Sequence, residues 1–378
     1  MPDVTTLDEL TLTRVTVPAR VTGVSTDEGA DFRAAIDVRN RVNVALLGAD
    51  ALEVTPEQSY PHWLTEDEEV HGWLVRSRGE VAGRAMMWVP LEAGSQRAQL
   101  RVEVLPAFRG RGIGRRALAF LEERAAEEGR TILQAWTEHP PSDEPGLTAQ
   151  TGFGAVPQDA TTRLAVGAGY TLEQVYRIST LRLDGDLSAI APLRDEAERA
   201  SEGYRYVSWT VPTPDAWVDD YAWMKSRMST DAPVGDSVMD EETWDAARVR
   251  RMEKVWTDSG MAVLVGAAEH IASGRLVAFT ELVSFRKPGK PIDQNDTLVL
   301  AEHRGHRLGA LVKTHTLALG RDAFPEGDRI MTGNAEENRP MLAVNEAMGF
   351  TPTRYSGEWQ KVIAPVAGTT RRSGSSDS

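Results

Sequence analysis

The spacing of apolar residues divides the first half of the chain into helical and extended segments. Helices are expected where apolar residues recur every three or four positions, and strands where they alternate or form short runs. Residues 98–105 are an example, because Leu100, Val102 and Val104 fall on one face of an extended chain. These rules predict helices at residues 31–47, 115–129 and 146–152 and strands at residues 72–77, 81–89, 98–105 and 131–136.

The second half of the chain repeats this order of segments. Arg109 and Arg304 lie 195 positions apart, as do Gly79 and Gly274 in two short hairpin turns. A period of this length indicates a duplicated domain, because solenoid repeats are only about 20–50 residues long. The second copy is expected to have helices at residues 189–201, 242–260 and 337–350, strands at residues 261–270, 276–285 and 329–334, and a strand, turn and helix within residues 295–319.

The duplication predicts an α+β chain of two tandem domains, at residues 1–168 and 169–365. Residues 366–378 are small and polar, so we expect a disordered tail there. Residues 224–242 have the composition of a flexible loop, and we hypothesise that this loop covers a substrate site.

Composition and charge restrict the possible functions. Of the 378 residues, 41% are hydrophobic and 26% are charged, which is a globular balance. The longest apolar run, at residues 261–268, is too short to span a bilayer, and the first residues lack the basic and apolar parts of a signal peptide. Without cysteine there is no disulfide, thiolate zinc site or cysteine nucleophile. A formal charge of −14 opposes binding to nucleic acid or anionic lipid, and it either favours cationic small molecules or serves only to keep the protein soluble. We expect a cytoplasmic protein without nucleic-acid or membrane partners.

A glycine-rich turn at residues 106–118, "PAFRGRGIGRRAL", follows a predicted strand and opens a predicted helix. Such a turn holds an anion, because glycine allows close approach and the N–H groups of a helix N-terminus are unpaired. A nucleotide P-loop is excluded, because Arg115 and Arg116 stand where lysine and serine or threonine are needed. A dinucleotide turn is disfavoured, because Arg115 replaces its third glycine.

The remaining pattern is Arg/Gln-x-x-Gly-x-Gly/Ala, here Arg109, Gly112 and Gly114 after Val102 and Val104. The stretch "VEVLPAFRGRGIGRRAL" resembles the acetyl-CoA-binding motif of the GCN5-related N-acetyltransferases (GNATs), and the Gly-Phe after the last helix of each half is typical of them. The resemblance implies a tandem protein in which each domain has a mixed, mostly antiparallel sheet flanked by helices. It also implies acetyl-CoA as co-substrate, bound by the strand edges and turns of both halves. The residues so implied are Val102, Glu103, Val104, Arg109, Gly110, Arg111, Gly112, Ile113, Gly114 and Arg115 in the first half, and Thr297, Leu298, Val299, Arg304, Gly305, His306, Arg307, Leu308, Gly309, Ala310, Asn334 and Asn338 in the second.

The second turn departs from the pattern, because Arg307 replaces the central glycine and either crowds a pyrophosphate or, turned outward, grips it. Many relatives also have a tyrosine four residues before the Gly of Gly-Phe, which is thought to protonate the departing thiolate. Thr148 and Asn345 occupy those positions here, and Tyr355 is a more distant substitute.

An amine acceptor also needs a base, because it arrives largely protonated near neutral pH. Glu103, Asp296 and Glu281 are the candidate catalytic carboxylates, each alternatively a solvated carboxylate on a strand. The histidines near the second turn are too few for a zinc site without thiols, so no metal is expected.

The expected function is acetyl-CoA-dependent N-acetyl transfer to a primary amine of a small molecule, by direct attack in a ternary complex. Two alternatives stay open. The missing tyrosines and Arg307 suit a CoA-binding or sensing protein without turnover, and the acidic balance permits acetylation of a peptide or protein amine.

Overall fold

The structure, a computed structural model, describes residues 4–7, 9–48, 53–142, 145–231, 235 and 237–364. The predicted disordered tail at residues 366–378 lies outside these residues. None of the described helices is both long enough and apolar enough to cross a membrane.

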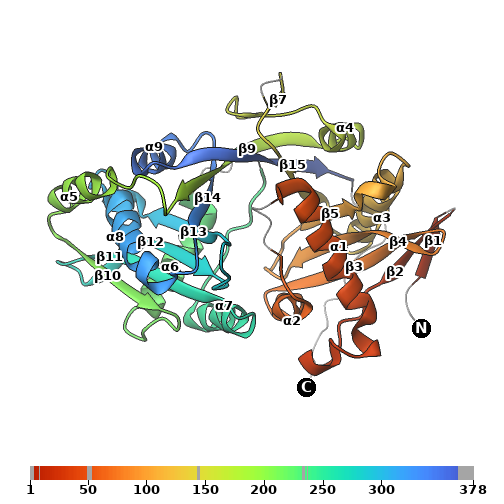
Figure 1. Cartoon of the computed structure of the whole chain (residues 1–378), viewed down its shortest axis with the longest axis horizontal. Coiled ribbons are helices and arrows are strands. Elements are labelled where there is room, and N and C mark those ends of the chain that lie inside the picture. The colour runs from red at the N-terminus through yellow and green to blue at the C-terminus, as the bar shows by residue number, and fades with distance from the viewer. Residues whose placement is uncertain are drawn as a thin grey trace.

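The first half forms strands and helices close to the predicted segments (Figure 1). Its helix α3 begins at Gly112, which has a positive φ of 74°, and Gly129 follows its end. Asp159 caps α4 through its side chain, which accepts from the N–H groups of Thr161 and Thr162. The elements are β1 (Val4–Leu7), β2 (Leu10–Arg14), η1 (Val21–Gly23), η2 (Asp27–Gly29), α1 (Ala30–Leu47), α2 (Pro56–Ser59), η4 (Tyr60–Trp63), β3 (Glu68–Ser77), β4 (Glu80–Pro90), β5 (Arg97–Val104), η5 (Pro106–Phe108), α3 (Ile113–Glu127), β6 (Ile132–His139), β7 (Leu147–Thr148), β8 (Ala155–Val156) and α4 (Ala160–Gly167).

The second half repeats the order strand, two helices, three strands, helix, strand, helix. An additional helix, α5, packs against α8, so α8 is covered on more than one side. The elements are β9 (Thr171–Arg182), α5 (Ile190–Ala200), β10 (Tyr204–Thr210), α6 (Val218–Asp231), α7 (Ala246–Asp258), β11 (Ala262–His270), β12 (Arg275–Ser284), β13 (Ile292–Val299), η6 (Ala301–His303), α8 (Leu308–Ala323), β14 (Arg329–Ala335), α9 (Arg339–Met348) and β15 (Thr351–Val362).

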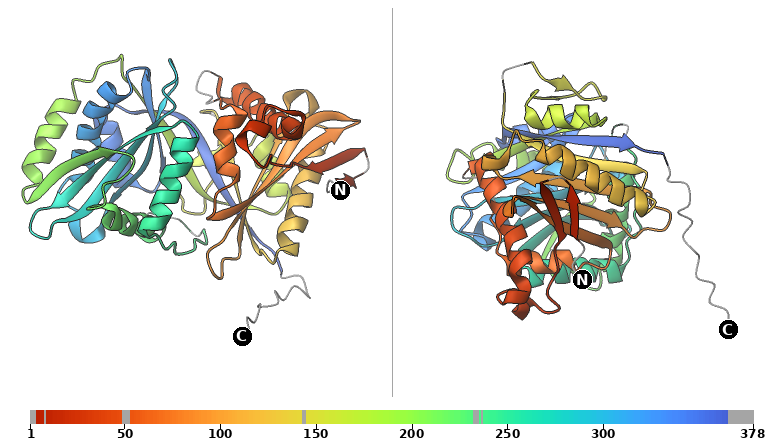
Figure 2. Two further views of the ribbon diagram at one scale, coloured as in Figure 1. Left: turned by 90° about the horizontal axis from the view of Figure 1, so that it is seen from below. Right: turned by 90° about the vertical axis from the view of Figure 1, so that its right-hand side faces the viewer.

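The two halves share one sheet, in which β9 and β15 form the connection. Among the described residues it has 13 strands in the order β1-β2-β3-β4-β5-β6-β15-β9-β14-β13-β12-β11-β10. The last strand of the chain, β15, pairs with β6 of the first half, and β9 pairs with β14 of the second half. Figures 1 and 2 show these long strands crossing from one half to the other. The mixed, mostly antiparallel α+β fold predicted from the sequence is confirmed.

The core reflects this strand exchange. Trp359 of β15 is fully buried in the first half, together with Trp73 of β3 and Phe120 of α3. The division at residues 168/169 falls just before β9, and so at the start of the shared ribbon of β9 and β15. It stays a prediction.

Two predicted segments differ from the structure. Residues 146–152 were expected to form a short helix, but they contain β7, which pairs with β8 in a small hairpin. The apolar spacing there is too short to distinguish the two forms. Residues 224–242 were expected to be a loop, but α6 continues to Asp231. The later described residues, from Ser237 to Asp245, have no helix or strand, and Val238 hydrogen-bonds to Gln134 and Gln360 beside the first half.

Candidate active site

The first glycine turn presents unpaired N–H groups at the start of α3. Arg109 Nε donates to the carbonyl of Val104 at 3.0 Å, which fixes the turn against the end of β5. Gly112 then begins α3 in the left-handed conformation, which glycine adopts without steric cost. In the described part of the chain, the N–H groups of residues 110–115 donate to no protein acceptor. The turn therefore fits an anionic ligand such as a pyrophosphate.

The second turn has the same construction. Arg304 Nε donates to the carbonyl of Val299 at 3.3 Å, and Arg307 begins α8 with a φ of 54°. The Arg307 guanidinium lies 2.7 Å from the carboxylate of Glu196 on α5, so its side chain is turned away from the helix N-terminus. Within the described residues, the N–H groups of 305–310 likewise donate to no protein acceptor. Arg307 thus holds a strained backbone conformation here, while its side chain is engaged by α5.

Next to each turn, two parallel strands pair and then separate. β5 and β6 pair from Arg97 opposite Ile132 to Leu100 opposite Ala135. β13 and β14 pair from Ile292 opposite Ile330 to Gln294 opposite Thr332. The predicted strand edges, at residues 102–104 and 297–299, lie just beyond these last pairs. Their backbone groups on that side are free of a neighbouring strand, so each half has an open edge for an extended ligand.

The two clefts differ in one feature of the strand. β13 contains a bulge, because its register with β12 shifts between Thr280 opposite Thr297 and Leu282 opposite Gln294. The corresponding pair of β4 and β5 keeps a constant register. A bulge bends its strand and redirects side chains, which places Asp296 beside Glu281 in the second half.

These features match a known family. A profile of the Acetyltransferase (GNAT) family matches residues 43–144. A tandem GNAT protein from the clavulanic acid biosynthesis pathway has a similar structure, with a TM-score of 0.70 and 25% sequence identity over 94% of this chain and 99% of that one. A GNAT domain therefore lies in the first half, and the whole chain has the fold of a tandem GNAT protein.

Two further GNAT structures share the fold. A GCN5-related N-acetyltransferase from Sphaerobacter thermophilus has a TM-score of 0.57 and 16% identity, covering 96% of this chain and 98% of that one. A glucosamine N-acetyltransferase region of a fungal multi-domain β-N-acetylglucosaminidase has a TM-score of 0.54 and 13% identity, covering 86% of this chain and 37% of that one. No curated protein matches the sequence. Family members are in general acyl-CoA-dependent N-acetyltransferases.

In the first GNAT half, the candidate base Glu103 is held in a buried ion pair with Arg84 on the adjacent strand. Burial alone would raise the pKa of Glu103, but the Arg84 guanidinium lowers it below its ordinary value. The carboxylate therefore stays ionised and bound, which makes it a weak proton acceptor.

In the second GNAT half, Glu281 and Asp296 are brought together by a lysine that sequence reasoning missed. Lys225 Nζ of α6 lies 2.8 Å from Glu281 and 2.7 Å from Asp296, and the Tyr221 hydroxyl donates to Glu281. Burial alone would lower the pKa of Lys225, but the two carboxylates raise it above its ordinary value. Burial raises the pKa of Glu281 despite Lys225.

The two asparagines predicted to contact CoA have different surroundings. Asn334 on β14 accepts a hydrogen bond from the side chain of Asn345 at 2.6 Å, and Asn345 in turn accepts from Lys313 at 2.9 Å. Asn338 begins α9 without a capping bond from its side chain. Asn334 is therefore hydrogen-bonded in a row with Asn345 and Lys313, just beyond the last pair of β13 and β14. Asn338 lies at the turn between β14 and α9.

A cavity of about 410 Å³ lies between the two GNAT halves. One wall of the cavity includes Trp88 of β4, which is on the sheet face away from α3. Trp88 lies opposite Gln99 of β5, and Gln99 directly precedes Leu100, the last residue of β5 that pairs with β6. Burial, with Glu92, Glu242 and Asp67 nearby, raises the pKa of Glu68 to about 7. The lining is acidic and aromatic, and it comprises His62, Thr65, Asp67, Glu68, Trp88, Pro90, Glu92, Arg97, Glu242, Trp244, Arg248, Met252, Val255 and Trp256.

The cavity also borders the second half. Arg248 of α7 lies 2.8 Å from Glu92 of the first half, which ties the two walls together. The rings of Trp244 and Trp256 line the cavity, and their centroids lie 5.5 and 5.8 Å from Lys225 Nζ. The cavity therefore lies between the two clefts. Sequence reasoning missed this cavity, because a single chain gives no sign that residues 62–97 and 242–256 face one another.

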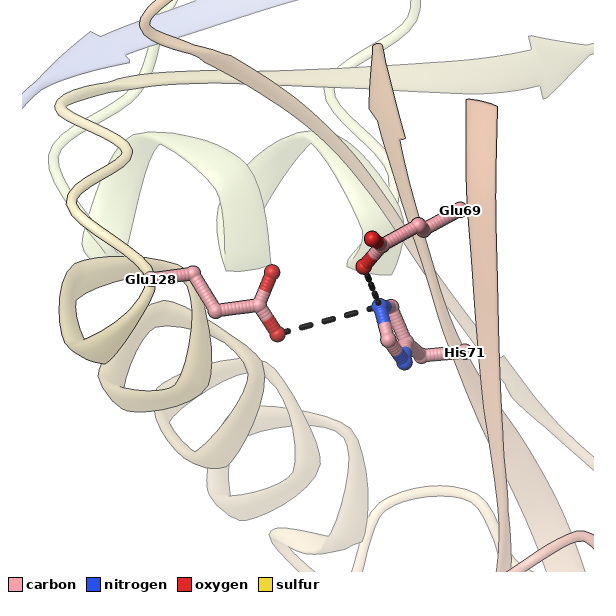
Figure 3. A group of neighbouring side chains, drawn as sticks. All are labelled: Glu69, His71 and Glu128. Carbon is pink, nitrogen blue, oxygen red and sulfur yellow. Dashed lines mark ion pairs between the residues drawn. The ribbon is translucent and has the colours of Figure 1, made fainter. Parts of the chain in front are cut away.

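A separate group, Glu69, His71 and Glu128, lies at the other end of α3 from the glycine turn (Figure 3). His71 Nε2 is 3.4 Å from Glu69 and 3.7 Å from Glu128. Arg14, which has only donors, lies 2.5 Å from Nδ1, so Nδ1 accepts and Nε2 carries the ring hydrogen. A metal ion would require that nitrogen without its hydrogen, so these residues fit an electrostatic contact between β3 and α3 better than a metal site.

Proposed function

We propose that this tandem GNAT protein transfers the acetyl group of acetyl-CoA to a primary amine of a small cationic molecule that binds in the cavity between the halves. The observation that carries the proposal is the position of that cavity. Its residue Trp88 lies opposite Gln99, next to the last pair of β5 and β6. Its residue Trp244 lies against Lys225, which pairs with Asp296 at the β13 bulge. Its carboxylates and indole rings are the groups that bind a cationic amine. We expect the enzyme to act in the cytoplasm.

The turns and strand edges support the choice of co-substrate. The N-termini of α3 and α8 would bind the pyrophosphate, and the open edges at residues 102–104 and 297–299 would pair with the extended arm. An N–H group at such an edge would stabilise the charge that develops on the thioester oxygen during attack. A chain without cysteine also suits direct transfer between two bound substrates.

Glu68 is the residue of the cavity best suited to take a proton from the amine. A base is most effective when its pKa is near the working pH, and the pKa of Glu68 is about 7. Glu103, Glu281 and Asp296 stay candidate bases, but each is engaged in an ion pair. Glu68 has no such bond to an arginine or lysine among the described residues.

The test is release of CoA thiol from acetyl-CoA with a panel of amines that includes aliphatic diamines, aromatic amines, an amino sugar and a basic peptide. We expect cationic small amines to react, and Glu68→Gln to lower kcat/KM for the amine about 100-fold, within the range of general-base effects. Glu9→Gln is the control, because Glu9 is an exposed acid that lies outside the cavity lining and pairs with Arg78 in the turn after β3.

Gly112→Trp and Gly309→Trp assign the chemistry to a half, since each blocks one turn. If CoA binds but no amine releases thiol, the alternative of a non-catalytic CoA-binding protein replaces this proposal. If only the basic peptide reacts, the acceptor is a peptide or protein amine instead.

A further inference from the structure

A buried lysine lies where β13 and β14 separate. Lys313 of α8 is 1% exposed, and its Nζ donates to Gln294 Oε1 at 2.8 Å and to Asn345 Oδ1 at 2.9 Å. Gln294 is the last residue of β13 that pairs with β14. The amine therefore lies at the apex of the second cleft, on the face covered by α8 and α9.

The elements packed around Lys313 present only uncharged groups to it within the described residues. β12 contributes Thr280, which accepts from Gln294 Nε2 at 3.0 Å, and α9 contributes Asn345. The ring of Phe350 lies 5.9 Å from Nζ. Burial lowers the pKa of Lys313 from 10.5 to about 7, with no carboxylate to oppose it. A buried amine without a counter-ion is costly to fold, and such groups gather at functional sites.

The first half shows that the fold does not require this charge. Its last paired residues are Leu100 and Ala135, and Leu118 stands five residues into α3 as Lys313 stands five residues into α8. Leu100 and Leu118 are buried in the apolar core, and Ala135 packs against it. The two halves thus share the same arrangement of helix and separating strands. The point where the strands separate is apolar in the first half and holds an amine in the second.

We propose that Lys313 is the proton donor to the sulfur that leaves the acyl-CoA bound in the second half. This inference rests on the proposed function, which places the thioester between the separated strands. The acceptor nitrogen forms a bond to the carbonyl carbon, the carbon–sulfur bond breaks, and the electron pair stays on sulfur, which takes a proton from Lys313 Nζ. The acceptor nitrogen loses one proton to solvent or a cavity carboxylate, and Lys313 regains one from solvent, so charge and atoms balance.

The chemistry of the site suits this step. No carboxylate neutralises the Lys313 ammonium, so a thiolate that forms beside it would be its nearest anion. The attraction between ammonium and thiolate is large in a low-dielectric site. Asn345 and Gln294 hold the amine at one place, so little reorganisation is needed when the sulfur departs. The pairing of Lys225 with two carboxylates shows the contrast, because that lysine is already neutralised.

The first measurement needs no acceptor. CoA is bound to the Gly112→Trp protein, in which only the second turn is open, and ionisation of its thiol is followed by the ultraviolet absorbance of the thiolate. We expect the bound thiol to ionise at least one pH unit lower with Lys313 than with Lys313→Met. Lys313→Arg keeps the charge and should retain the lower value. Leu118→Met, at the matching position of the first half, should change nothing.

The second measurement is kinetic. We expect Lys313→Met to lower kcat about 100-fold or more, with KM for acetyl-CoA within twofold, because the loss falls on the leaving step. Lys313→Arg should also be slow at neutral pH, since arginine does not release its proton there. The wild-type rate should fall as pH rises above the pKa of Lys313 in the complex, and this limb should be absent in Lys313→Met.

The outcomes separate this inference from the function it rests on. A thiol titration that depends on Lys313, with no amine that reacts, supports the placement of Lys313 and contradicts the proposed acceptor. An equal thiol titration in wild type and Lys313→Met, or turnover that Gly309→Trp leaves unchanged, overturns the role of Lys313 while acetyl transfer by the first half still holds. Circular dichroism of each variant shows that it is folded.

Discussion

Replacing Lys313 by methionine should change how stability depends on pH, in a direction that follows from its burial. The pKa of Lys313 is lowered from 10.5 to about 7 in the folded chain. Between these values the unfolded chain holds a proton that the folded chain lacks, so folding becomes more favourable as pH rises. The penalty for burying Lys313 is therefore complete below about pH 7 and disappears toward pH 10.5.

The magnitude can be worked from those two values. Each pH unit within the window is about 1.4 kcal/mol, so the full gap corresponds to about 5 kcal/mol, and the part between pH 7 and pH 9 to about 3 kcal/mol. Methionine has a similar length and no charge, so Lys313→Met removes this dependence. It also leaves the oxygens of Gln294 and Asn345 without a donor, but that cost is the same at every pH and cancels in the comparison.

The assay is urea denaturation of wild type and Lys313→Met at half-unit steps from pH 6 to pH 9. We expect the free energy of unfolding of the variant, minus that of wild type, to be about 3 kcal/mol larger at pH 7 than at pH 9, so the variant gains most stability at pH 7. Lys254→Met is the matched control, because Lys254 is exposed on α7. A difference that stays constant over this range, or one that grows toward high pH, would refute the reasoning that Lys313 is buried without a counter-ion.

Three further predictions concern stability, each measured by the denaturation midpoint. Trp359→Ala should cost about 3–5 kcal/mol, because the ring is fully buried in the first half, and a loss below 1 kcal/mol would contradict that packing. Arg84→Met should cost about 3–5 kcal/mol by leaving the Glu103 carboxylate buried and unpaired, and adding Glu103→Gln should restore most of it. Asp159→Ala should cost about 1–2 kcal/mol, because it removes the cap of α4 and the partner of His139; an unchanged midpoint would count against the cap.

The glycine turns and the duplication could be predicted from the sequence because both depend on local residue types. Gly112 and Gly114 follow an alternating strand, and the same order returns after 195 positions. The tandem GNAT fold follows from those features, and the structure and comparisons confirm it. The orientation of Arg307 was left open, because its partner Glu196 belongs to α5, a helix with no counterpart in the first half.

The polar groups of the site were harder to predict, because they depend on packing between distant segments. Lys313 lies in a largely apolar run, where a lysine usually marks the solvent side of a helix. It is buried because its side chain faces the sheet, where Gln294 of β13 and Asn345 of α9 accept from its Nζ. The cavity likewise needs residues 62–97 and 242–256 to meet, and no period in the sequence relates them. Glu103 was correctly placed on its strand, but its pairing with Arg84 depends on the register of β4 and β5.

The position of β15 has a consequence for synthesis of the chain. The free edge of β6 receives its partner only from residues 355–362, which leave the ribosome after every other strand of the described sheet. Until then the nascent first half has an unpaired strand edge and lacks Trp359 in its core, and open edges of this kind are sites of aggregation. The first half thus cannot complete its sheet and core before the strands of the second half have been made, and a product that ended before Thr351 would lack both the partner of β6 and Trp359. Synthesis of β15 is therefore required before the first half can fold completely.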